Sequence, residues 1–259
     1  MRFLNKVLKK PYFSNHVMAN ESIYLELHHK AKQNENKIAK QIEEKYNYNI
    51  DYKFFENLAL HTQVVLKKSK LNYQHGRILY TLLMHHFKKN KIKNVNILET
   101  GTARGFSSIC MSKAINDLKI NGKIFTIDII PHDVKIYWNC IDDNEEKKTR
   151  NELLLKWNNE TKNIIFINET TKNFIKKFYL PRINFAFLDA EHKFNDVLRE
   201  FRYVEMRQEK NDLIFFDDVT PDLFPGVVKA IKFIENEKNY HVEYYLSSNQ
   251  RGYALAKKL

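Results

Sequence analysis

The spacing of hydrophobic residues changes near residue 90 of the chain. Before that point, apolar residues recur every three or four positions among Lys, Glu, Gln and Asn, which is typical of amphipathic helices. Asn20 and Asp51 stand directly before two of these stretches, and both residue types favour the first position of a helix. The pattern therefore predicts three or four helices and no strand in residues 1–90.

Beyond residue 94, short apolar runs alternate with stretches of helical periodicity. This alternation indicates right-handed βαβ units and a mostly parallel sheet. Only residues 247–251 separate the last two runs, too few for a crossover, so these runs are expected to form an antiparallel hairpin. The predicted fold class is α/β, a Rossmann-like sheet of seven strands with an antiparallel C-terminal hairpin, preceded by helices. The expected strands are 95–98, 123–129, 164–167, 183–188, 212–216, 241–246 and 252–256, and the expected helices are 106–118, 145–158, 171–178, 194–208 and 227–237.

The amino-acid composition limits the classes of binding partner and the cellular location that can be expected. The 259 residues include 43 Lys and Arg against 31 Asp and Glu, a net charge of +12 at pH 7. This charge favours an anionic partner, but the basic residues are scattered along the chain, which disfavours nucleic acid. The two cysteines, Cys110 and Cys140, cannot form a disulfide framework. No apolar run reaches the length of a membrane span, and residues 1–13 lack the apolar core of a signal peptide, so a cytoplasmic protein is expected.

The first expected strand leads into a glycine-containing loop, ETGTARGFS at residues 99–107. Its glycine spacing differs from the dinucleotide-binding G-x-G-x-x-G motif, and it lacks the Gly-Lys-Ser/Thr of a P-loop. Gly101 allows the backbone to approach a ligand closely, and ligands of open α/β sheets bind at the carboxyl ends of the strands. Asp128 ends the second strand, where an acid suits ribose hydroxyls; the alternative is an ordinary turn residue.

Acidic side chains follow both the fourth and the fifth expected strand. Asp189, Glu191 and His192 come after the fourth strand, and Asp217 and Asp218 come after the fifth. Carboxylates that converge at one edge of a sheet repel each other unless a cation lies between them, and oxygen ligands suit Mg²⁺, Mn²⁺ or Ca²⁺ better than zinc. We therefore expect a metal site at Asp189, Asp217 and Asp218. The alternative is that Asp189 and Asp217 cap the following helices and that Asp218 is a surface acid.

Four segments carry a resemblance to a known family: ILETGTARGFSS at 97–108, FTID at 125–128, FAFLDAEHKFNDVLREF at 185–201 and DLIFFDD at 212–218. From about residue 79 to residue 259, the chain resembles the class I S-adenosylmethionine (SAM)-dependent methyltransferases. It is most similar to the metal-dependent sugar O-methyltransferases of the macrocin, mycinamicin and aminocoumarin type, and less similar to the catechol-type enzymes. The resemblance implies a SAM-binding methyltransferase domain over residues 91–259. It also implies a helical cap over residues 1–90 that closes the site and mediates a homo-oligomer.

The resemblance further implies roles for single residues. The loop after the first strand would hold the methionine part of SAM, and Asp128 its ribose, whereas Asn168 replaces the glycine that the family has near adenine. Mg²⁺ or Mn²⁺ would be bound by the three aspartates after strands four and five. Either Glu191 or His192 would be the base that removes the proton of the acceptor hydroxyl. The expected cofactor-binding residues are Glu99, Thr100, Gly101, Gly105, Ser107, Asp128, Glu169, Thr170 and Asp189.

The expected reaction is methyl transfer to a hydroxyl of a sugar, with a phosphorylated or nucleotide-linked sugar for a capsule or other surface glycan as the acceptor. The surplus of basic residues suits this acceptor, and Arg104, His132, Lys193 and Arg251 are candidate anion contacts. A catechol or another natural product is the alternative acceptor. A nucleic-acid methyltransferase is disfavoured, because DAEH at 189–192 replaces the tetrapeptide of base N-methyltransferases. A non-catalytic scaffold, an NAD-dependent enzyme and the methyltransferase-like hydroxylases of cephalosporin clusters are further alternatives.

Overall fold

The computed structural model describes residues 15–34, 36–246 and 251–259, which divide into two compact units. The first, which we call the helical unit, contains the described residues up to Lys91 together with Ala103–Lys119 and Ile129–Lys162. The second, the sheet unit, contains Ile92–Thr102, Ile120–Asp128 and the described residues of Asn163–Leu259. The signal-peptide expectation at residues 1–13, and the expected turn at 247–251 except for its last residue, lie outside the described residues.

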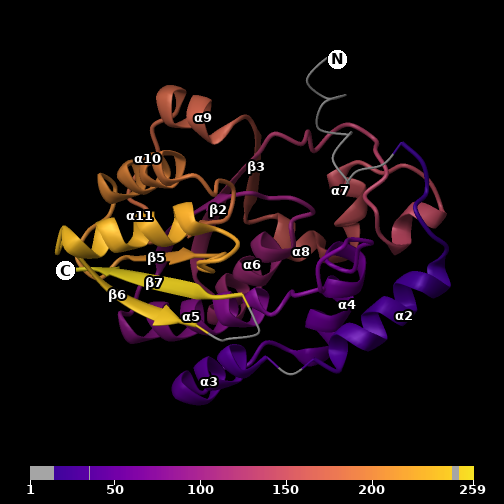
Figure 1. Ribbon diagram of the computed structural model, residues 1–259, viewed down its shortest axis with the longest axis horizontal. Helices are drawn as coiled ribbons and strands as arrows, with labels where there is room; N and C mark the ends of the chain where they lie inside the picture. The colour runs from indigo at the N-terminus through magenta and orange to yellow at the C-terminus, as the bar shows by residue number, and fades with distance from the viewer. Residues whose placement is uncertain (1–14, 35, 247–250) are drawn as a thin grey trace. The chain divides into compact units, whose positions relative to one another are not determined.

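A mixed sheet of seven strands, in the order β3-β2-β1-β4-β5-β7-β6, forms the core of the sheet unit (Figure 1). The neighbours from β3 to β5 pair in parallel, whereas β7 runs antiparallel to both β5 and β6. This is the predicted α/β sheet with its antiparallel C-terminal hairpin, so the fold class is confirmed. The strands are β1 (Asn94–Thr100), β2 (Asn121–Asp128), β3 (Ile164–Asn168), β4 (Phe185–Leu188), β5 (Leu213–Phe216), β6 (Tyr240–Tyr245) and β7 (Tyr253–Lys258).

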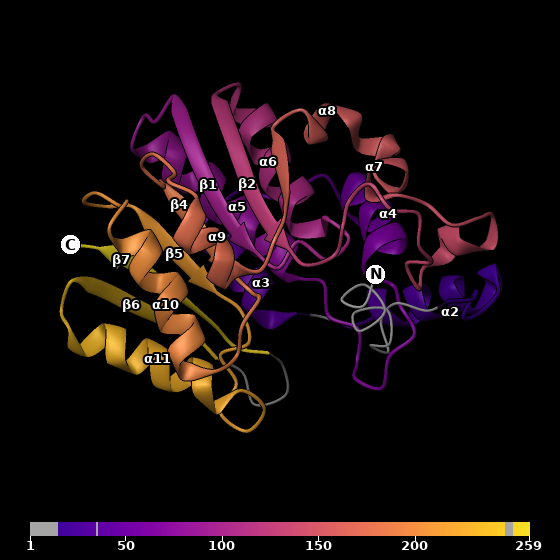
Figure 2. The same ribbon diagram turned by 90° about the horizontal axis from the view of Figure 1, so that it is seen from above.

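Three helices of the sheet unit lie side by side against this sheet: α9 (Thr171–Lys177), α10 (Phe194–Glu205) and α11 (Pro225–Asn236) (Figure 2). The apolar faces of α10 and α11 share one hydrophobic core with residues of the central strands. β4 and β5 are buried along their whole length, as parallel strands usually are. The polar residues that follow these two strands are therefore held at fixed positions along the carboxyl edge of the sheet.

Two helices of the helical unit begin where the sequence predicts. The side chain of Asn20 accepts a hydrogen bond from the N–H of Ile23, and that of Asp51 accepts one from the N–H of Phe54. The described part of residues 1–90 contains helices and no strand, as predicted. The helices are α2 (Glu21–Lys32), α3 (Lys37–Tyr46), α4 (Tyr52–Thr62), α5 (His75–Lys89) and α6 (Phe106–Leu118), followed by the short elements η1 (Ile141–Asn144), α7 (Arg150–Leu153), η2 (Leu155–Trp157) and α8 (Asn158–Thr161).

Aromatic packing joins these helices. The ring of Phe106 at the start of α6 lies 5.7 Å from that of Phe55 on α4 and 6.3 Å from that of Tyr73, measured between ring centres. Gly76 on α5 allows this packing, because a Cβ atom there would lie 2.6 Å from the Phe106 ring. Among the described helices, none combines the length and apolar character that crossing a membrane would require.

The helix predicted over residues 145–158 is wrong. Ile136 and Lys148 exchange two backbone hydrogen bonds of 3.0 Å across an isolated antiparallel bridge, which takes Lys148 out of any helix. Thr149 then starts the short helix α7 through a capping box with Glu152. The elements α7, η2 and α8 replace the continuous helix, because long-range backbone pairing here outweighs local helix propensity.

Candidate active site

The carboxyl end of β1 is held by a chain of buried hydrogen bonds. Glu99 is fully buried and accepts a hydrogen bond of 2.5 Å from the hydroxyl of Thr126 on the neighbouring strand β2. The hydroxyls of Thr126 and Thr102 also lie 2.5 Å apart, so the chain of hydrogen bonds reaches into the loop after β1. The carboxylate of Glu99 therefore has a fixed position at the beginning of the glycine loop.

Gly101 brings the loop after β1 against the residue that follows β4. It has a φ of +94°, a conformation that glycine adopts far more readily than other residues. A Cβ atom at this position would lie 2.6 Å from the carbonyl oxygen of Asp189. The N–H of Asp189 also donates to the carbonyl of Thr100 over 3.1 Å. Two predicted cofactor-binding positions are thus in contact through their backbones.

The side chain of Thr100 links β1 to α10. Its hydroxyl donates to Oε2 of Glu200 over 3.0 Å. Glu200 is 3% exposed, and burial raises its pKa to about 8, against the opposite effect of hydrogen bonds from Thr100 and Thr171. The hydroxyl of Thr100, a predicted cofactor contact, is therefore engaged with a buried carboxyl group.

We expect Glu200→Gln to stabilise the protein at alkaline pH. A carboxyl group whose pKa is raised by folding stabilises the folded state while it is protonated, and this contribution is lost as the pH rises from 4.5 towards about 8. Glutamine keeps an acceptor for Thr100 but brings no buried charge. The melting temperature of the variant should match the parent protein at about pH 5 and exceed it at about pH 9.

Thermal unfolding followed by circular dichroism at both pH values measures this difference. Glu146→Gln, at an exposed position, is the matched control and should behave like the parent protein at both. A gain at Glu200→Gln that does not depend on pH would contradict the raised pKa.

Three potential metal-binding side chains meet at the carboxyl ends of β4 and β5. Ligand atoms of Asp189, His192 and Asp218 all lie within 4.8 Å of one another. His192 Nε2 lies 3.0 Å from Oδ2 of Asp218, and Arg251 forms an ion pair of 2.8 Å with Oδ1 of the same carboxylate. Asp218, which is 3% exposed, is therefore the centre of this acidic cluster.

His192 is positioned by the start of α11. The ring of Phe224 stacks on the imidazole, with 4.4 Å between ring centres. Gly226 in the first turn of α11 leaves room for the backbone of the same residue, because a Cβ atom there would lie 2.3 Å from the carbonyl oxygen of His192. Two residues that no sequence motif singled out thus direct the imidazole towards Asp218.

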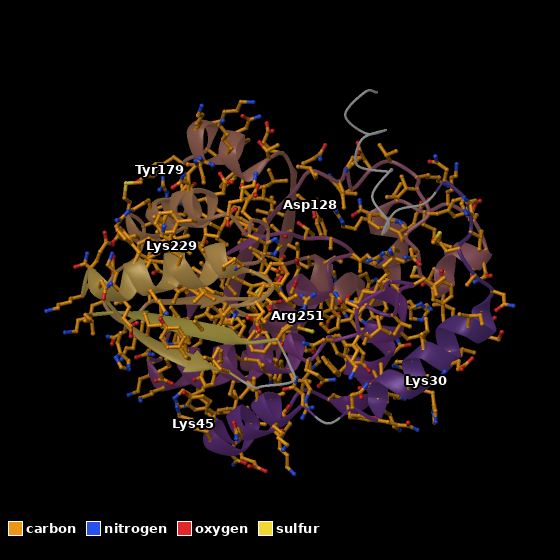
Figure 3. All side chains as sticks on the ribbon, in the orientation of Figure 1. Lys30, Lys45, Asp128, Tyr179, Lys229 and Arg251 are labelled. Carbon is orange, nitrogen blue, oxygen red and sulfur yellow. The ribbon has the colours of Figure 1, made fainter. Side chains whose placement is uncertain are left out.

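Arg251, which Figure 3 labels, lies two residues before β7, and its guanidinium pairs with Asp218 of the cluster. The next residue, Gly252, accepts a hydrogen bond of 2.9 Å from the N–H of Val219, and a side chain at this glycine would collide with the carbonyl oxygen of Val219. This close backbone contact aligns the start of β7 with the residues after β5. Arg251, an expected anion contact, pairs its guanidinium with Asp218.

Burial and neighbouring carboxylates raise the pKa of Asp189 and of Asp217. Burial, together with the charges of Asp217 and Asp218, holds the pKa of Asp189 well above its usual range. Burial and the charge of Asp218 raise the pKa of Asp217 to about 7. Burial lowers the pKa of Arg251, but the three carboxylates outweigh this effect and raise it. Fully ionised, the three carboxylates would carry more negative charge than one guanidinium neutralises, so protonation of Asp189 and Asp217 is favoured.

Asp217 is placed differently from the other two predicted metal ligands. Its Oδ1 accepts a hydrogen bond of 2.6 Å from the N–H of Asp218, which has a φ of +58°. Among the described residues, the group whose ligand atoms converge contains Asp189, His192 and Asp218 and does not include Asp217. Asp217 thus supports the backbone turn that presents Asp218, and the third converging side chain is the predicted base His192.

The donor set of the cluster fits a divalent cation. Carboxylate oxygens are preferred ligands of Mg²⁺ and Mn²⁺, and imidazole is an accepted ligand of Mn²⁺. The raised pKa values of the aspartates indicate that further positive charge is favoured at this point. Because Arg251 already pairs with Asp218, a bound dication would share that carboxylate with the guanidinium.

The ends of β2 and β3 hold the expected nucleoside contacts. The carbonyl of Asp128, which Figure 3 labels, accepts hydrogen bonds from the N–H of Glu169 over 2.9 Å and from the side chain of Asn168 over 3.2 Å. Glu169 accepts a hydrogen bond from the side chain of Asn173, and the hydroxyl of Thr170 caps α9. The side chains of Glu169 and Thr170 are therefore engaged in starting α9.

Gly105 and Ser107, the remaining predicted cofactor residues, belong to the helical unit. Gly105 has a φ of +89° and directly precedes α6, and Ser107 is buried in the first turn of that helix. Sequence reasoning pointed to Gly105 because a glycine allows this left-handed start of a helix. Gly105 and Ser107 thus both lie at the start of α6, the helix that follows the glycine loop.

Two buried arginines hold the loop before α6. Arg104 is 6% exposed and donates from Nε to the carbonyl of Trp138 over 2.6 Å. Arg150 is 2% exposed and donates to the carbonyls of Ala103 over 2.9 Å and Ile130 over 3.1 Å. The expected anion contact at Arg104 is therefore wrong, because its guanidinium binds a backbone carbonyl inside the helical unit.

Comparisons with known proteins agree with this architecture. Residues 98–219 match the sequence model of a family described as a methyltransferase domain. A search of curated proteins found no match. Among solved structures, TomG from Streptomyces achromogenes, an O-methyltransferase involved in tomaymycin synthesis and solved in complex with SAM, is similar with a TM-score of 0.54 at 14% identity, covering 93% of this chain and 99% of that one.

Two further structures show the same fold. The O-methyltransferase from Bacillus cereus in complex with SAH has a TM-score of 0.53 at 12% identity, covering 92% of this chain and 97% of that one. Cofactor-bound Rv0187 from MTB has a TM-score of 0.58 at 16% identity, covering 81% of this chain and 90% of that one. The chain thus has the α/β methyltransferase fold that was expected, and residues 98–219 are similar to the methyltransferase domain family. This segment includes Glu99, Asp128, Asp189 and Asp218, whereas Arg251 lies beyond it.

Proposed function

We propose that the protein is a SAM-dependent O-methyltransferase that binds a divalent metal and methylates a hydroxyl of a sugar. The proposed acceptor is a phosphorylated or nucleotide-linked sugar of the kind used to build surface glycans. The observation that supports the proposal most directly is the cluster of Asp189, His192 and Asp218, which lies at the carboxyl ends of two neighbouring strands in a methyltransferase fold. A dication at this edge would orient and acidify a sugar hydroxyl.

The proposed SAM site uses the ends of β1 and β2. Glu99 and Gly101 stand where β1 passes into the glycine loop, and Asp128 ends β2, the parallel neighbour of β1. Ligands of such sheets bind at this edge, and the fold shared with the SAM complex of TomG and the SAH complex of the Bacillus cereus enzyme supports SAM as the methyl donor. The further proposed contacts are Thr100, Gly105, Ser107, Glu169 and Thr170.

Glu191 is the proposed base. Desolvation and the neighbouring charge of Asp196 raise its pKa, which makes its carboxylate a stronger base. It accepts the proton of the acceptor hydroxyl while the hydroxyl oxygen forms its bond to the methyl carbon and the carbon–sulfur bond breaks. When bound, SAM would supply the methyl group on a sulfonium centre, and a dication held by the cluster would supply positive charge near the acceptor oxygen. His192 faces Asp218, and we propose it as a metal ligand together with Asp189 and Asp218.

The first test of this proposal is binding of SAM and SAH, measured by isothermal titration calorimetry. We expect both to bind and NAD not to bind. Turnover with a panel of nucleotide sugars, sugar phosphates and catechols, measured as SAH release, should stop after dialysis against EDTA and return with Mg²⁺ or Mn²⁺. Absence of SAM binding would refute the methyltransferase proposal. Turnover that survives EDTA would refute metal assistance alone, and turnover of a catechol but no sugar would favour the alternative acceptor.

The proposal also includes an assembly and a location. We propose that residues 1–90 form a cap over the acceptor and an oligomer interface, and that the protein acts in the cytoplasm as a homo-oligomer. Size-exclusion chromatography with light scattering on the full chain measures the number of subunits.

A further inference from the structure

Ala103, in the middle of the glycine loop, has a φ of +45°. Glycine adopts this left-handed conformation readily, whereas an alanine in it is strained. A strained residue of this kind persists only where the surrounding structure holds it, and such residues gather at active sites and ligand-binding loops. Contacts from elsewhere in the helical unit must therefore hold Ala103 in this conformation.

Arg150 supplies such a contact. It is buried, and its guanidinium donates from Nε to the carbonyl of Ala103 over 2.9 Å and from Nη2 to the carbonyl of Ile130 over 3.1 Å. Because the guanidinium is planar and rigid, these two hydrogen bonds fix its orientation. Holding the carbonyl of Ala103 holds the peptide group that follows this residue, and with it the left-handed backbone conformation.

Trp138 joins this contact to a second one. Its side chain is fully buried, and the guanidinium carbon of Arg150 lies 5.6 Å from the centre of its ring, within the range of a cation–π interaction. The carbonyl of Trp138 accepts hydrogen bonds from both Nε and Nη2 of Arg104, over 2.6 Å from Nε. One tryptophan thus holds two successive loop residues, Ala103 through Arg150 and Arg104 directly.

The segment that carries Trp138, residues 130–150, is itself fixed. The backbone N–H of Trp138 donates to Oδ1 of Asp143 over 2.7 Å, and its indole N–H donates to the carbonyl of Lys148 over 2.7 Å. Lys148 is also paired with Ile136 through the isolated antiparallel bridge. This segment between β2 and α7 is therefore a rigid support for the glycine loop.

We propose that Arg150 is a positioning residue that keeps the glycine loop in the shape required to bind the methionine part of SAM. This inference rests on the proposed function, because the loop is the proposed site for that part of SAM. Without Arg150, Ala103 relaxes towards a negative φ, and the loop backbone on either side changes direction. Binding of SAM must then restore the strained conformation, so its affinity falls.

Arg150→Gln should weaken the binding of SAM and SAH by at least about tenfold, measured by isothermal titration calorimetry on the full chain. Methylthioadenosine has the same nucleoside but no amino-acid group, so its affinity should not change. A purely structural role of Arg150 would instead weaken all three ligands alike. Lys147→Gln is the matched control, because it removes an exposed charge that lies 5.3 Å from the ring centre of Tyr137 in the same segment. It should bind every ligand like the parent protein.

Substitutions at Ala103 test whether the backbone conformation is the link. Ala103→Gly removes the strain, so the double variant Arg150→Gln/Ala103→Gly should bind SAM more tightly than Arg150→Gln alone. Ala103→Val, with Arg150 intact, should weaken SAM binding, because a β-branched residue hardly adopts a positive φ. This second variant keeps the proposal testable if circular dichroism shows that Arg150→Gln does not fold.

Three results would overturn the role of Arg150. The first is equal affinity of Arg150→Gln and the parent protein for SAM. The second is an equal loss of affinity for SAM and methylthioadenosine that Ala103→Gly does not restore. The third is unchanged SAM binding in Ala103→Val. Failure of the parent protein itself to bind SAM would refute the proposed function, so the two proposals fail in different ways.

Discussion

Asp218→Asn is expected to lower the rate of methyl transfer by at least about a hundredfold. The carboxylate is buried at the centre of the acidic cluster, 3.0 Å from His192 Nε2 and 2.8 Å from Arg251. Asparagine has nearly the same shape but no charge. The proposed dication therefore loses a carboxylate ligand, and Arg251 loses its ion-pair partner. The variant should also need more Mg²⁺ or Mn²⁺ for half-maximal activity. SAH release measured against metal concentration gives both quantities.

Asp222→Asn is the matched control for this experiment, because Asp222 is an exposed acid just beyond the cluster. It removes one negative charge without touching the described ligands and should leave activity and metal requirement unchanged. Asp218→Asn should stay folded by circular dichroism and still bind SAM, since Glu99, Gly101 and Asp128 are intact. Full activity of Asp218→Asn at every metal concentration would show that the cluster is not the metal site.

Gly101→Ala is expected to be more damaging than Gly105→Ala, although both glycines have a positive φ. The strain of this backbone conformation costs a residue with a side chain about 1–2 kcal/mol at either position. At Gly101 the new methyl group would also lie 2.6 Å from the carbonyl oxygen of Asp189, a backbone atom held by β4. At Gly105 the nearest atom is Cδ1 of Leu154 at 2.8 Å, the end of a flexible side chain that can turn away.

Thermal unfolding and titration with SAM measure the difference between these two variants. Gly101→Ala should lower the melting temperature more and weaken SAM binding by at least about tenfold, because the loop must move away from Asp189. Gly105→Ala should show the smaller loss of stability. If the two variants lose the same stability and affinity, the backbone contact between Gly101 and Asp189 does not hold the loop.

The sheet could be predicted because each strand has a local signal. The runs Phe185–Leu188 and Leu213–Phe216 are apolar without interruption, and both are buried along their whole length. Since parallel neighbours end at the same edge, the acids that follow these two runs had to come close together, as Asp189 and Asp218 do. The helix over 145–158 could not be excluded in this way, because the pairing that prevents it involves Ile136, outside any local pattern.

The partners of the acids could not be predicted, because they come from distant segments. Arg251 reaches Asp218 through the alignment of β7 with β5, and Phe224 is one apolar residue among many in the sequence. A sequence motif also does not reveal whether the side chain of a matching residue is already hydrogen-bonded to another part of the protein. Thr100 and Glu169 stand at the expected positions, but their side chains bind Glu200 on α10 and Asn173 on α9.

The place of β7 in the sheet has a consequence for the synthesis of the protein. Residues 253–258 lie between β5 and β6 in the sheet, although they are synthesised after both of these strands. Until they emerge, β5 has an unpaired edge and Asp218 lacks Arg251, which lies two residues before β7. The nascent chain therefore exposes a hydrophobic strand edge that favours association with other chains. Closure of the sheet and neutralisation of its acidic edge then occur together, after the synthesis of β7.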